Sequence, residues 1–217
     1  MLTLFEELFT LTLNDEKGNP FPFNRKDLAP PLGGAILAEL AFLGKLCITE
    51  KLRLAPCDAT QTGDRFLDGI LEHVQAGDKA RKSSYWVSRL GEEPKKLWQS
   101  VGEDLAAKNL LVQDEKRFFR QPPGAEVAPV LLDKFQMKHR LRLSILSSGE
   151  NDARSLALLK ILMAGDLLGL VFTLDEIETA KMAIDKQFMA AALEDPILQV
   201  VEEIAQAVSA VREDEMD

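Results

Sequence analysis

The most apolar stretch of the chain, residues 32–43, predicts a buried helix at the centre of the fold. Glu39 is its only charged residue. A helix that is apolar on nearly every side has to be covered by other elements. Pro30 and Pro31 directly precede the stretch, so we expect the helix to begin after them. Gly44 follows, and glycine commonly ends helices in the left-handed conformation.

Elsewhere, apolar residues recur at a spacing of three and four, which predicts a series of amphipathic helices. Thr3 and Glu6 have the spacing of a capping box at the first of these helices, and Thr62 is expected to cap the next. The predicted helices cover residues 4–11, 62–77, 83–91, 94–108, 130–147, 155–165, 175–193 and 196–212. We therefore expect a mostly α fold, with a central helix bundle, surrounding amphipathic helices and one or two short β-hairpins. It would form a single domain, 1–212, followed by a frayed acidic tail, 213–217.

One local pattern occurs twice, at residues 39–47 and 104–112. Each copy reads acid–Leu–Ala, then a residue that ends a helix, then a short apolar strand. The residues at the helix end are Gly44 and Asn109, and asparagine is the next most frequent residue after glycine in the left-handed region. A return strand follows each copy, so the sequence predicts two helix–hairpin units, which resemble winged helices.

Composition and charge narrow the possible partners. The 217 residues are 46% hydrophobic and 28% charged, as in an ordinary globular protein. The formal net charge is −9, and an acidic chain lacks the positive field that nucleic-acid binding needs. A local basic face that contacts a membrane is compatible with this total. With no signal peptide and no apolar run that would span a bilayer, we expect a cytoplasmic protein, or one peripheral on the cytoplasmic face of a membrane.

Few residues suggest catalytic or metal chemistry. His73 and His139 lie in no metal-binding spacing with cysteines or carboxylates. The pair Gly33–Gly34 lacks the other residues of a phosphate-binding loop and is better explained by close helix packing. Cys47 and Cys57 flank the first predicted hairpin, and we expect two reduced, half-buried thiols there. The sequence therefore indicates a non-enzymatic protein with no catalytic residues, no metal and no cofactor.

Short basic clusters are the main candidates for a binding surface. They are Arg25–Lys26, residues 79–82 and Lys95–Lys96, and Trp86 and Trp98 stand near two of them. Cations beside an aromatic residue suit an anionic lipid headgroup at a membrane interface. The alternative is solvated surface charge, with the tryptophans in the core.

The second hairpin offers Phe118 and Phe119 between cations. Exposed aromatic residues at such a tip would insert into a membrane or pair with another subunit. An ordinary strand with one phenylalanine turned inward is the alternative.

The order of several short motifs over nearly the whole chain resembles the Golgi phosphoprotein 3 (GPP34) family. These motifs are LTLFEE at 2–7, GAILAELA at 34–41 followed by Gly44, TGD at 62–64, LD at 67–68 with Leu71 and His73, AKNLL at 107–111, and SLALL at 155–159. The resemblance implies an all-helical fold with a protruding β-hairpin that is linked to self-association and membrane insertion. It also implies a peripheral membrane protein that binds phosphatidylinositol 4-phosphate. The eukaryotic members carry a basic leader that is not seen here, which indicates a bacterial member.

The resemblance also gives positions for the headgroup site. A tryptophan of the family falls on Asn24, or on Phe23 with one gap, and an arginine before the glycine pair falls on Gly33. A pair of arginines falls on Lys95 and Trp98. One cation of three is kept, and lysine lacks the bidentate geometry of arginine, so the site is degenerate.

Three functional hypotheses follow. The leading one is a protein that binds an anionic headgroup or membrane surface through Arg25, Lys95 and nearby groups. The second is a protein–protein adaptor or self-assembling scaffold, a homo-oligomer that uses the hairpin with Phe118 and Phe119. The third is a winged-helix-like nucleic-acid binder, which the acidic charge disfavours.

Overall fold

The computed structural model describes residues 2–14, 19–20, 23–77, 79–115, 117–120, 134–146 and 152–214. Most of this part of the chain is helical, which confirms the mostly α fold class. Its helices are α1 (Leu4–Thr12), α2 (Arg25–Phe42), α3 (Arg65–Gln75), α4 (Ser83–Gly91), α5 (Pro94–Ala107), α6 (Lys134–Leu146), α7 (Ala153–Ala164), the short 3-10 helix η1 (Leu168–Leu170), α8 (Ile177–Ala192) and α9 (Pro196–Asp214). The division into one domain and a tail stays a prediction. Helix α9 continues to Asp214, and residues 215–217 lie outside the described part.

Short strands form three separate antiparallel pairs in the described residues. Strand β1 (Leu13–Asn14) pairs with β2 (Asn19–Pro20), β3 (Leu46–Ile48) with β4 (Leu54–Pro56), and β5 (Leu111–Asp114) with β6 (Arg117–Arg120). The last two pairs are the predicted hairpins. The β1–β2 pair has two residues in each strand, too few for an alternating pattern to reveal it.

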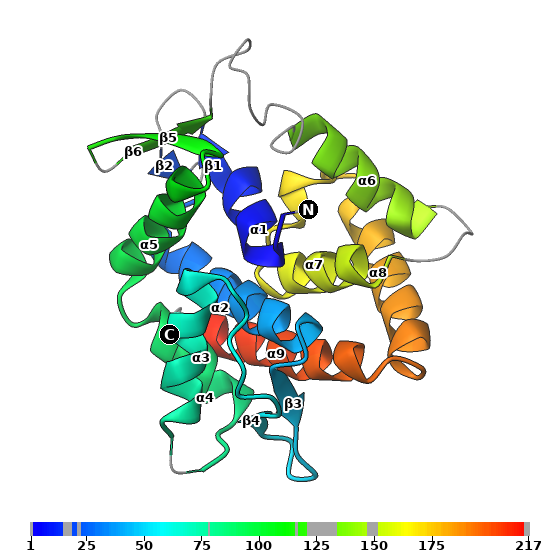
Figure 1. Cartoon of the computed structure of the whole chain (residues 1–217). Coiled ribbons are helices and arrows are strands. Elements are labelled where there is room, and N and C mark those ends of the chain that lie inside the picture. The colour runs from blue at the N-terminus through cyan, green and yellow to red at the C-terminus, as the bar shows by residue number, and fades with distance from the viewer. Residues whose placement is uncertain are drawn as a thin grey trace.

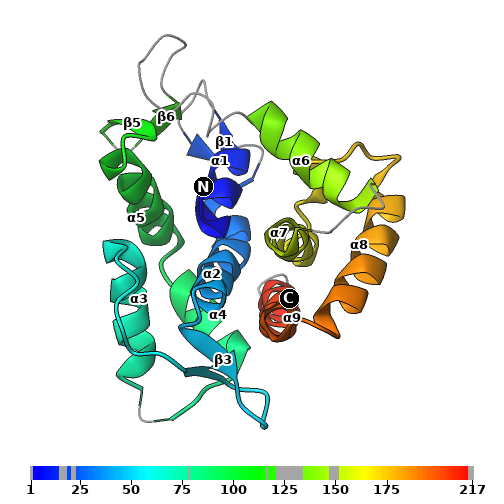
Figure 2. The same cartoon turned by 45° about the vertical axis from the view of Figure 1, so that its right-hand side comes forward.

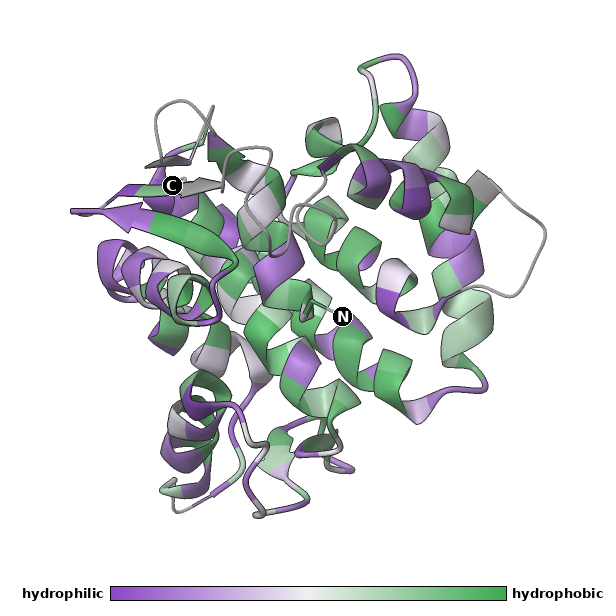
Figure 3. Cartoon of the chain, turned by 45° about the horizontal axis from the view of Figure 1, so that its top comes forward, coloured by the Kyte–Doolittle hydropathy of each residue, from purple (hydrophilic) through white to green (hydrophobic). Residues whose placement is uncertain are grey.

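Helix α2 runs through the middle of the molecule (Figure 1) and packs against α1, α4, α5, α7 and α9. In Figure 2, α3 and α5 lie on one side of α2, and α6, α7 and α8 lie on the other. Hydrophobic residues are concentrated in the inner helices, whereas hydrophilic residues are more frequent on the outer helices and hairpins (Figure 3). The predicted central bundle with surrounding helices is therefore present.

Helix α2 begins at Arg25, so the expectation that it starts after Pro31 was wrong. Asn24 caps it, because its side-chain oxygen accepts hydrogen bonds from the N–H groups of Lys26 (2.8 Å) and Asp27 (3.1 Å). Interior prolines cost a helix about 3 kcal/mol, but both proline rings are buried here. Pro31 lies so close to Gly165 that a Cβ on that glycine would come within 2.8 Å of it. Capping and close packing thus offset the hydrogen bonds that the prolines cannot make.

The one charge in the apolar part of α2 links three helices. Glu39 is buried, and its carboxylate accepts hydrogen bonds from the Leu4 N–H at the start of α1 (2.8 Å) and from the Arg154 guanidinium of α7 (2.6 Å). A buried carboxylate without partners would be strongly destabilising. This carboxylate therefore fixes where α1 and α7 begin against α2.

The repeated sequence pattern folds the same way twice. Gly44 and Asn109 both adopt the left-handed conformation, with φ of 69° and 57°. After each helix, the left-handed residue donates its N–H to the carbonyl three residues earlier. The next residue donates to the carbonyl five residues before it, at 2.8 Å for Lys45 and 2.9 Å for Leu110. Both helices therefore end in a Schellman motif that leads into a hairpin.

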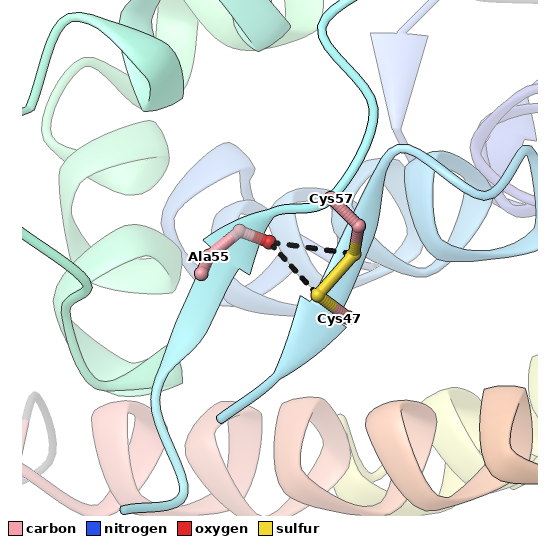
Figure 4. Close-up of a disulfide and its surroundings, with 3 residues drawn as sticks. All are labelled: Cys47, Ala55 and Cys57. Atoms are coloured by element: carbon pink, nitrogen blue, oxygen red, sulfur yellow. Dashed lines mark hydrogen bonds between the residues drawn. A yellow bond between two sulfur atoms is a disulfide. The ribbon is translucent and has the colours of Figure 1, made fainter. Parts of the chain in front are cut away.

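A disulfide joins Cys47 and Cys57 (Figure 4), so the expectation of two reduced thiols was wrong. The β3–β4 register places Cys47 opposite Ala55, and Cys57 follows directly after β4. The two Cα atoms are 5.9 Å apart, within the range that a disulfide spans. The carbonyl oxygen of Ala55 faces both sulfur atoms.

Next to this disulfide in the chain, Lys45 holds the segment 58–60 that follows the hairpin. Its ammonium group donates to the Asp58 carboxylate (2.6 Å) and to the Thr60 hydroxyl (2.7 Å). The hydrogen bond from Lys45, with those from Thr60, lowers the pKa of Asp58 from 3.8 to about 2. Asp58 therefore stays ionised well into the acid range.

Lys108 has a similar role before the second hairpin. Its ammonium group donates to Glu6 (2.8 Å), Asp64 (2.6 Å) and Asp104 (2.7 Å). Burial by itself would lower the pKa of Lys108, but these three hydrogen bonds outweigh it and raise the pKa. The cluster ties α1 and the start of α3 to the end of α5.

The β5–β6 hairpin places Phe118 in the core. The Phe118 side chain is fully buried and packs edge-on against Phe9. It also covers Gly102 of α5, where an added Cβ would come within 2.3 Å of the Phe118 ring. Phe118 is therefore not exposed for a membrane or a second subunit. The side chain of Phe119 lies outside the described part, and the call on it stays a prediction.

Candidate anion-binding site

A hollow of about 760 Å³ opens where the first turns of α2 and α5 meet, and we call it the basic pocket. It is lined by Pro20, Phe23, Asn24, Arg25, Lys26, Glu93, Pro94, Lys95 and Lys96. Four of these residues are cations and one is an anion. The pocket is thus a positively charged region on a protein whose net charge is −9.

Helix α2 provides a well-anchored wall of the basic pocket. Phe23 is partly buried and packs against the hydrophobic core. Asn24 fixes the first turn of the helix through its capping bonds, and Arg25 and Lys26 are the first two helical residues. Their backbone positions are therefore set by the cap, while the charged ends of both side chains remain available to a ligand.

Helix α5 contributes the opposite wall. It starts with Pro94, and Glu93 at the cap position makes no side-chain capping bond. The positive end of the α5 dipole and the adjacent lysines favour an anion at this place. Lys96 approaches Glu93 at 3.4 Å, an exposed pair of a kind that contributes little to stability.

Three of the four pocket cations, Arg25, Lys26 and Lys95, form no ion pair within the described residues. Cations held close together without counter-charges repel one another, and a bound anion relieves this repulsion. Arginine additionally offers a planar fork that can bind a phosphate group with two hydrogen bonds. The arrangement suits a phosphate-bearing ligand.

The structure brings together four of the six residues that the sequence predicted for the headgroup site. Phe23, Asn24, Arg25 and Lys95 all line the basic pocket. Gly33 lies eight residues into α2, or about 12 Å along the helix, and faces Leu90, whose Cβ would be 3.3 Å from an added Cβ. An arginine could therefore not replace Gly33 without displacing α4.

Trp98, the sixth position, is 1% exposed. Its ring stacks on Phe9 with centroids 3.9 Å apart. This contact places Trp98 in the core and outside the basic pocket. Trp98 thus follows the alternative given by the sequence, in which the tryptophans lie in the core and the nearby charges are solvated.

Sequence reasoning did not assign Lys26, Lys96 and Glu93 to the site. The signal for the two lysines was present, because each follows another cation in the chain, at Arg25–Lys26 and Lys95–Lys96. No pattern in the sequence indicated that these two clusters meet. The two clusters meet because α2 starts at Arg25 and because α4 and α5 pack against α2.

A smaller hollow of about 290 Å³ adjoins the basic pocket and shares Glu93 and Lys96 with it. Its walls come mainly from α3, α4 and α5 and combine apolar residues such as Phe66 and Ile70 with charged ones such as Arg89 and Glu92. His73 at its edge is exposed, and its Nδ1 lies 2.6 Å from the Gly69 carbonyl. The two hollows therefore meet at a charged border formed by Glu93 and Lys96.

The described part of the chain contains neither a metal-ligand cluster nor a helix that could span a membrane. No group of three or more histidine, cysteine or carboxylate side chains there is arranged to hold a metal ion. No helix in the same part of the chain combines the length and hydropathy needed to cross a bilayer.

Comparison with known proteins places the fold in a family. The family model described as Golgi phosphoprotein 3 (GPP34) matches residues 4–211. The chain belongs to the GPP34 family. The match covers α1 and nearly all of α9, so the bundle and both hairpins are parts of this family domain.

A more distant similarity points the same way. A VPS74-like protein from Dictyostelium discoideum is 28% identical over 131 residues. The aligned region is 54% of this chain and spans about half the length of that relative. The activity and partners of the whole relative are therefore not transferred to this chain.

Proposed function

We propose that this GPP34 protein binds an anionic, phosphate-bearing headgroup in the basic pocket and thereby attaches to a membrane surface. The observation that carries the proposal is the convergence of Arg25, Lys26, Lys95 and Lys96 on one hollow. These residues come from chain segments about 70 positions apart, and three of them lack a partner charge among the described residues. Membership of the GPP34 family supports a lipid ligand of the phosphatidylinositol 4-phosphate type.

The proposal is for binding without catalysis, at the cytoplasmic face of a membrane. The basic pocket holds cations and a helix N-terminus but no histidine or cysteine, the residues that most often act as bases or nucleophiles. Such a pocket can orient a phosphate group and neutralise its charge. It offers no evident means to break a bond.

The proposal is tested by replacing pocket cations and measuring headgroup binding. We expect Lys95→Gln and Arg25→Gln each to weaken binding of a soluble inositol phosphate by about 10- to 100-fold, because each removes a charge-assisted hydrogen bond worth about 1.5–3 kcal/mol. Binding would be measured by calorimetry at low salt. The same variants should bind less well to vesicles that contain phosphatidylinositol 4-phosphate.

Two further variants control for charge in general. Lys186→Gln removes an exposed cation of α8, away from the pocket, and should leave headgroup binding unchanged. Glu93→Gln removes the one carboxylate of the pocket and should tighten binding by about two- to fivefold. Equal losses with Lys95→Gln and Lys186→Gln would contradict a specific site. No measurable binding by the unaltered protein would also contradict it.

A further inference from the structure

The tip of the β3–β4 hairpin exposes a leucine at a backbone position that favours glycine or asparagine. Leu52 has φ of 52° and is 57% exposed. Its N–H donates to the Thr49 carbonyl at 2.9 Å, and the Thr49 N–H donates to the Arg53 carbonyl at 2.9 Å. A leucine in the left-handed region is unfavourable, because its Cβ crowds the backbone. Neither the turn nor the core requires a leucine at this position, which makes the exposed side chain a candidate for an outside contact.

Lys51 and Arg53 flank the exposed leucine in the chain, and further cations lie in the hollows beside them. Two adjoining hollows share Arg53, and their lining includes Lys51, Lys79, Arg81 and Lys82. We call these five cations together with Leu52 the tip surface. Glu50 and Asp214 are the only carboxylate residues among the described lining residues, and Asp78 lies outside the described part. In that part of the chain, the five cations form no ion pair.

The tip surface is held by bonds to its neighbours. Leu54 and Arg81 exchange backbone hydrogen bonds of 2.9 and 3.3 Å, and the Arg53 guanidinium donates to the Ala80 carbonyl at 3.2 Å. The Cys47–Cys57 disulfide closes the other end of the hairpin (Figure 4). The Arg81 guanidinium also lies over the exposed ring of Tyr85, 5.0 Å from its centre. These contacts present Leu52 and its cations as one fixed surface.

We propose that the tip surface is a membrane contact, in which Leu52 enters the interface of an anionic bilayer while the surrounding cations attract its phosphate groups. An apolar side chain flanked by long cationic ones matches the apolar and charged layers of such an interface. A stable protein–protein interface would instead need about 1,000 Å² with an apolar centre, and here the centre is a single leucine. The proposal rests on the proposed function at a membrane but concerns a surface separate from the basic pocket.

The decisive variant is Leu52→Asn, because asparagine keeps the left-handed turn and removes the apolar side chain. We expect about tenfold weaker partition onto phosphatidylcholine vesicles that contain phosphatidylserine, measured by flotation. The matched control is Leu174→Asn. Leu174 is also exposed but is followed by two acids, Asp175 and Glu176, and its replacement should leave partition unchanged.

The dependence on salt concentration distinguishes the contribution of Leu52 to membrane binding from that of the cations. Lys79→Gln should weaken partition by about fivefold at low salt and have little effect at high salt, where exposed charges are screened. At high salt, Leu52→Asn should still weaken whatever partition onto vesicles remains. A Leu52→Asn effect that disappeared with salt would overturn the insertion of Leu52.

A soluble ligand distinguishes failure of this inference from failure of the proposed function. Leu52→Asn should leave inositol phosphate binding unchanged, because no bilayer is involved, whereas Lys95→Gln should lower binding to both the soluble ligand and vesicles. If Leu52→Asn partitions onto vesicles like the unaltered protein, the membrane contact is overturned, and a protein partner becomes the occupant of the tip. If only the Lys95→Gln expectation fails, the basic pocket is overturned and the tip surface stands.

Discussion

The β3–β4 and β5–β6 hairpins start from the same structural motif and are stabilised in different ways. Each follows a helix that ends in a left-handed residue, with the same pair of backbone hydrogen bonds. The β5–β6 hairpin then buries Phe118 against Phe9 and Gly102. The β3–β4 hairpin is closed by a disulfide and leaves Leu52 exposed.

The difference shows how a hairpin can keep an apolar residue on the surface. A short two-stranded hairpin is at best marginally stable alone. Burying an aromatic residue stabilises it but removes that residue from contact with other molecules. A covalent link stabilises it without using the apolar residue. The β3–β4 hairpin, which has the covalent link, can therefore keep Leu52 on its surface.

The largest expected effect comes from the buried hairpin. Phe118→Ala should lower the free energy of unfolding by about 3–5 kcal/mol, because it opens a cavity against Phe9 and α5. Urea denaturation would measure the loss, with tryptophan fluorescence as the signal, since Trp98 stacks on Phe9. A loss below about 1 kcal/mol would mean that the hairpin is not part of the core.

The glycine beneath Phe118 provides an independent check. Gly102→Ala would place a Cβ within 2.3 Å of the Phe118 ring, and such overpacking costs about 1–3 kcal/mol. Gly69→Ala is the matched control, because Gly69 is also helical and an added Cβ there meets nothing within 4 Å. It should be neutral or stabilise the protein by about 0.5–1 kcal/mol.

The next largest effect concerns the covalent link. Replacing Cys47 and Cys57 together by alanine should lower the free energy of unfolding by about 2–3 kcal/mol, the value expected for a loop of this length. A reducing agent should produce the same loss in the unaltered protein and none in the double variant. Denaturation curves of the unaltered protein that do not change on reduction would contradict the disulfide.

These two hairpins also mark how far the sequence can be interpreted alone. Gly44 and Asn109 were predictable, because the left-handed helix end is a local property of the residue type. The Cys47–Cys57 pairing was not, because it depends on the register that sets Cys47 opposite Ala55. The exposure of Leu52 and the burial of Phe118 depend on what each hairpin packs against.

The same distinction holds for the basic pocket. Arg25 and Lys95 were singled out from the sequence, and they do line one hollow. Gly33 and Trp98 are excluded from it by packing against Leu90 and Phe9. The start of α2 was mispredicted because the local cost of Pro30 and Pro31 is visible in the sequence, whereas the burial that offsets it is a tertiary effect.

The smallest expected effect is an acid-dependent change in the disulfide-linked hairpin. The pKa of Asp58 is lowered from 3.8 to about 2, first by its hydrogen bond from Lys45 and then by those from Thr60. Because the folded pKa lies below the ordinary value, this interaction stabilises the fold fully above pH 3.8. The contribution is lost as the pH falls toward 2. The other hairpin has carboxylates of its own at its base, in the Lys108 cluster. Burial raises the pKa of Asp104 there, so the acid response of that hairpin should begin at a higher pH.

Carboxyl NMR titration would measure this directly. Asp58 should titrate near pH 2 in the unaltered protein. In Lys45→Met its midpoint should rise but stay below 3.8, because the hydrogen bonds from Thr60 remain. Backbone amide signals should shift with the same midpoint at Cys57, whose N–H donates to the Lys45 carbonyl at 2.9 Å, and Lys45→Met should move that midpoint at Cys57 but not the titration seen at Phe118. A midpoint of 3.8 in both proteins would show that the Lys45–Asp58 ion pair does not stabilise this hairpin.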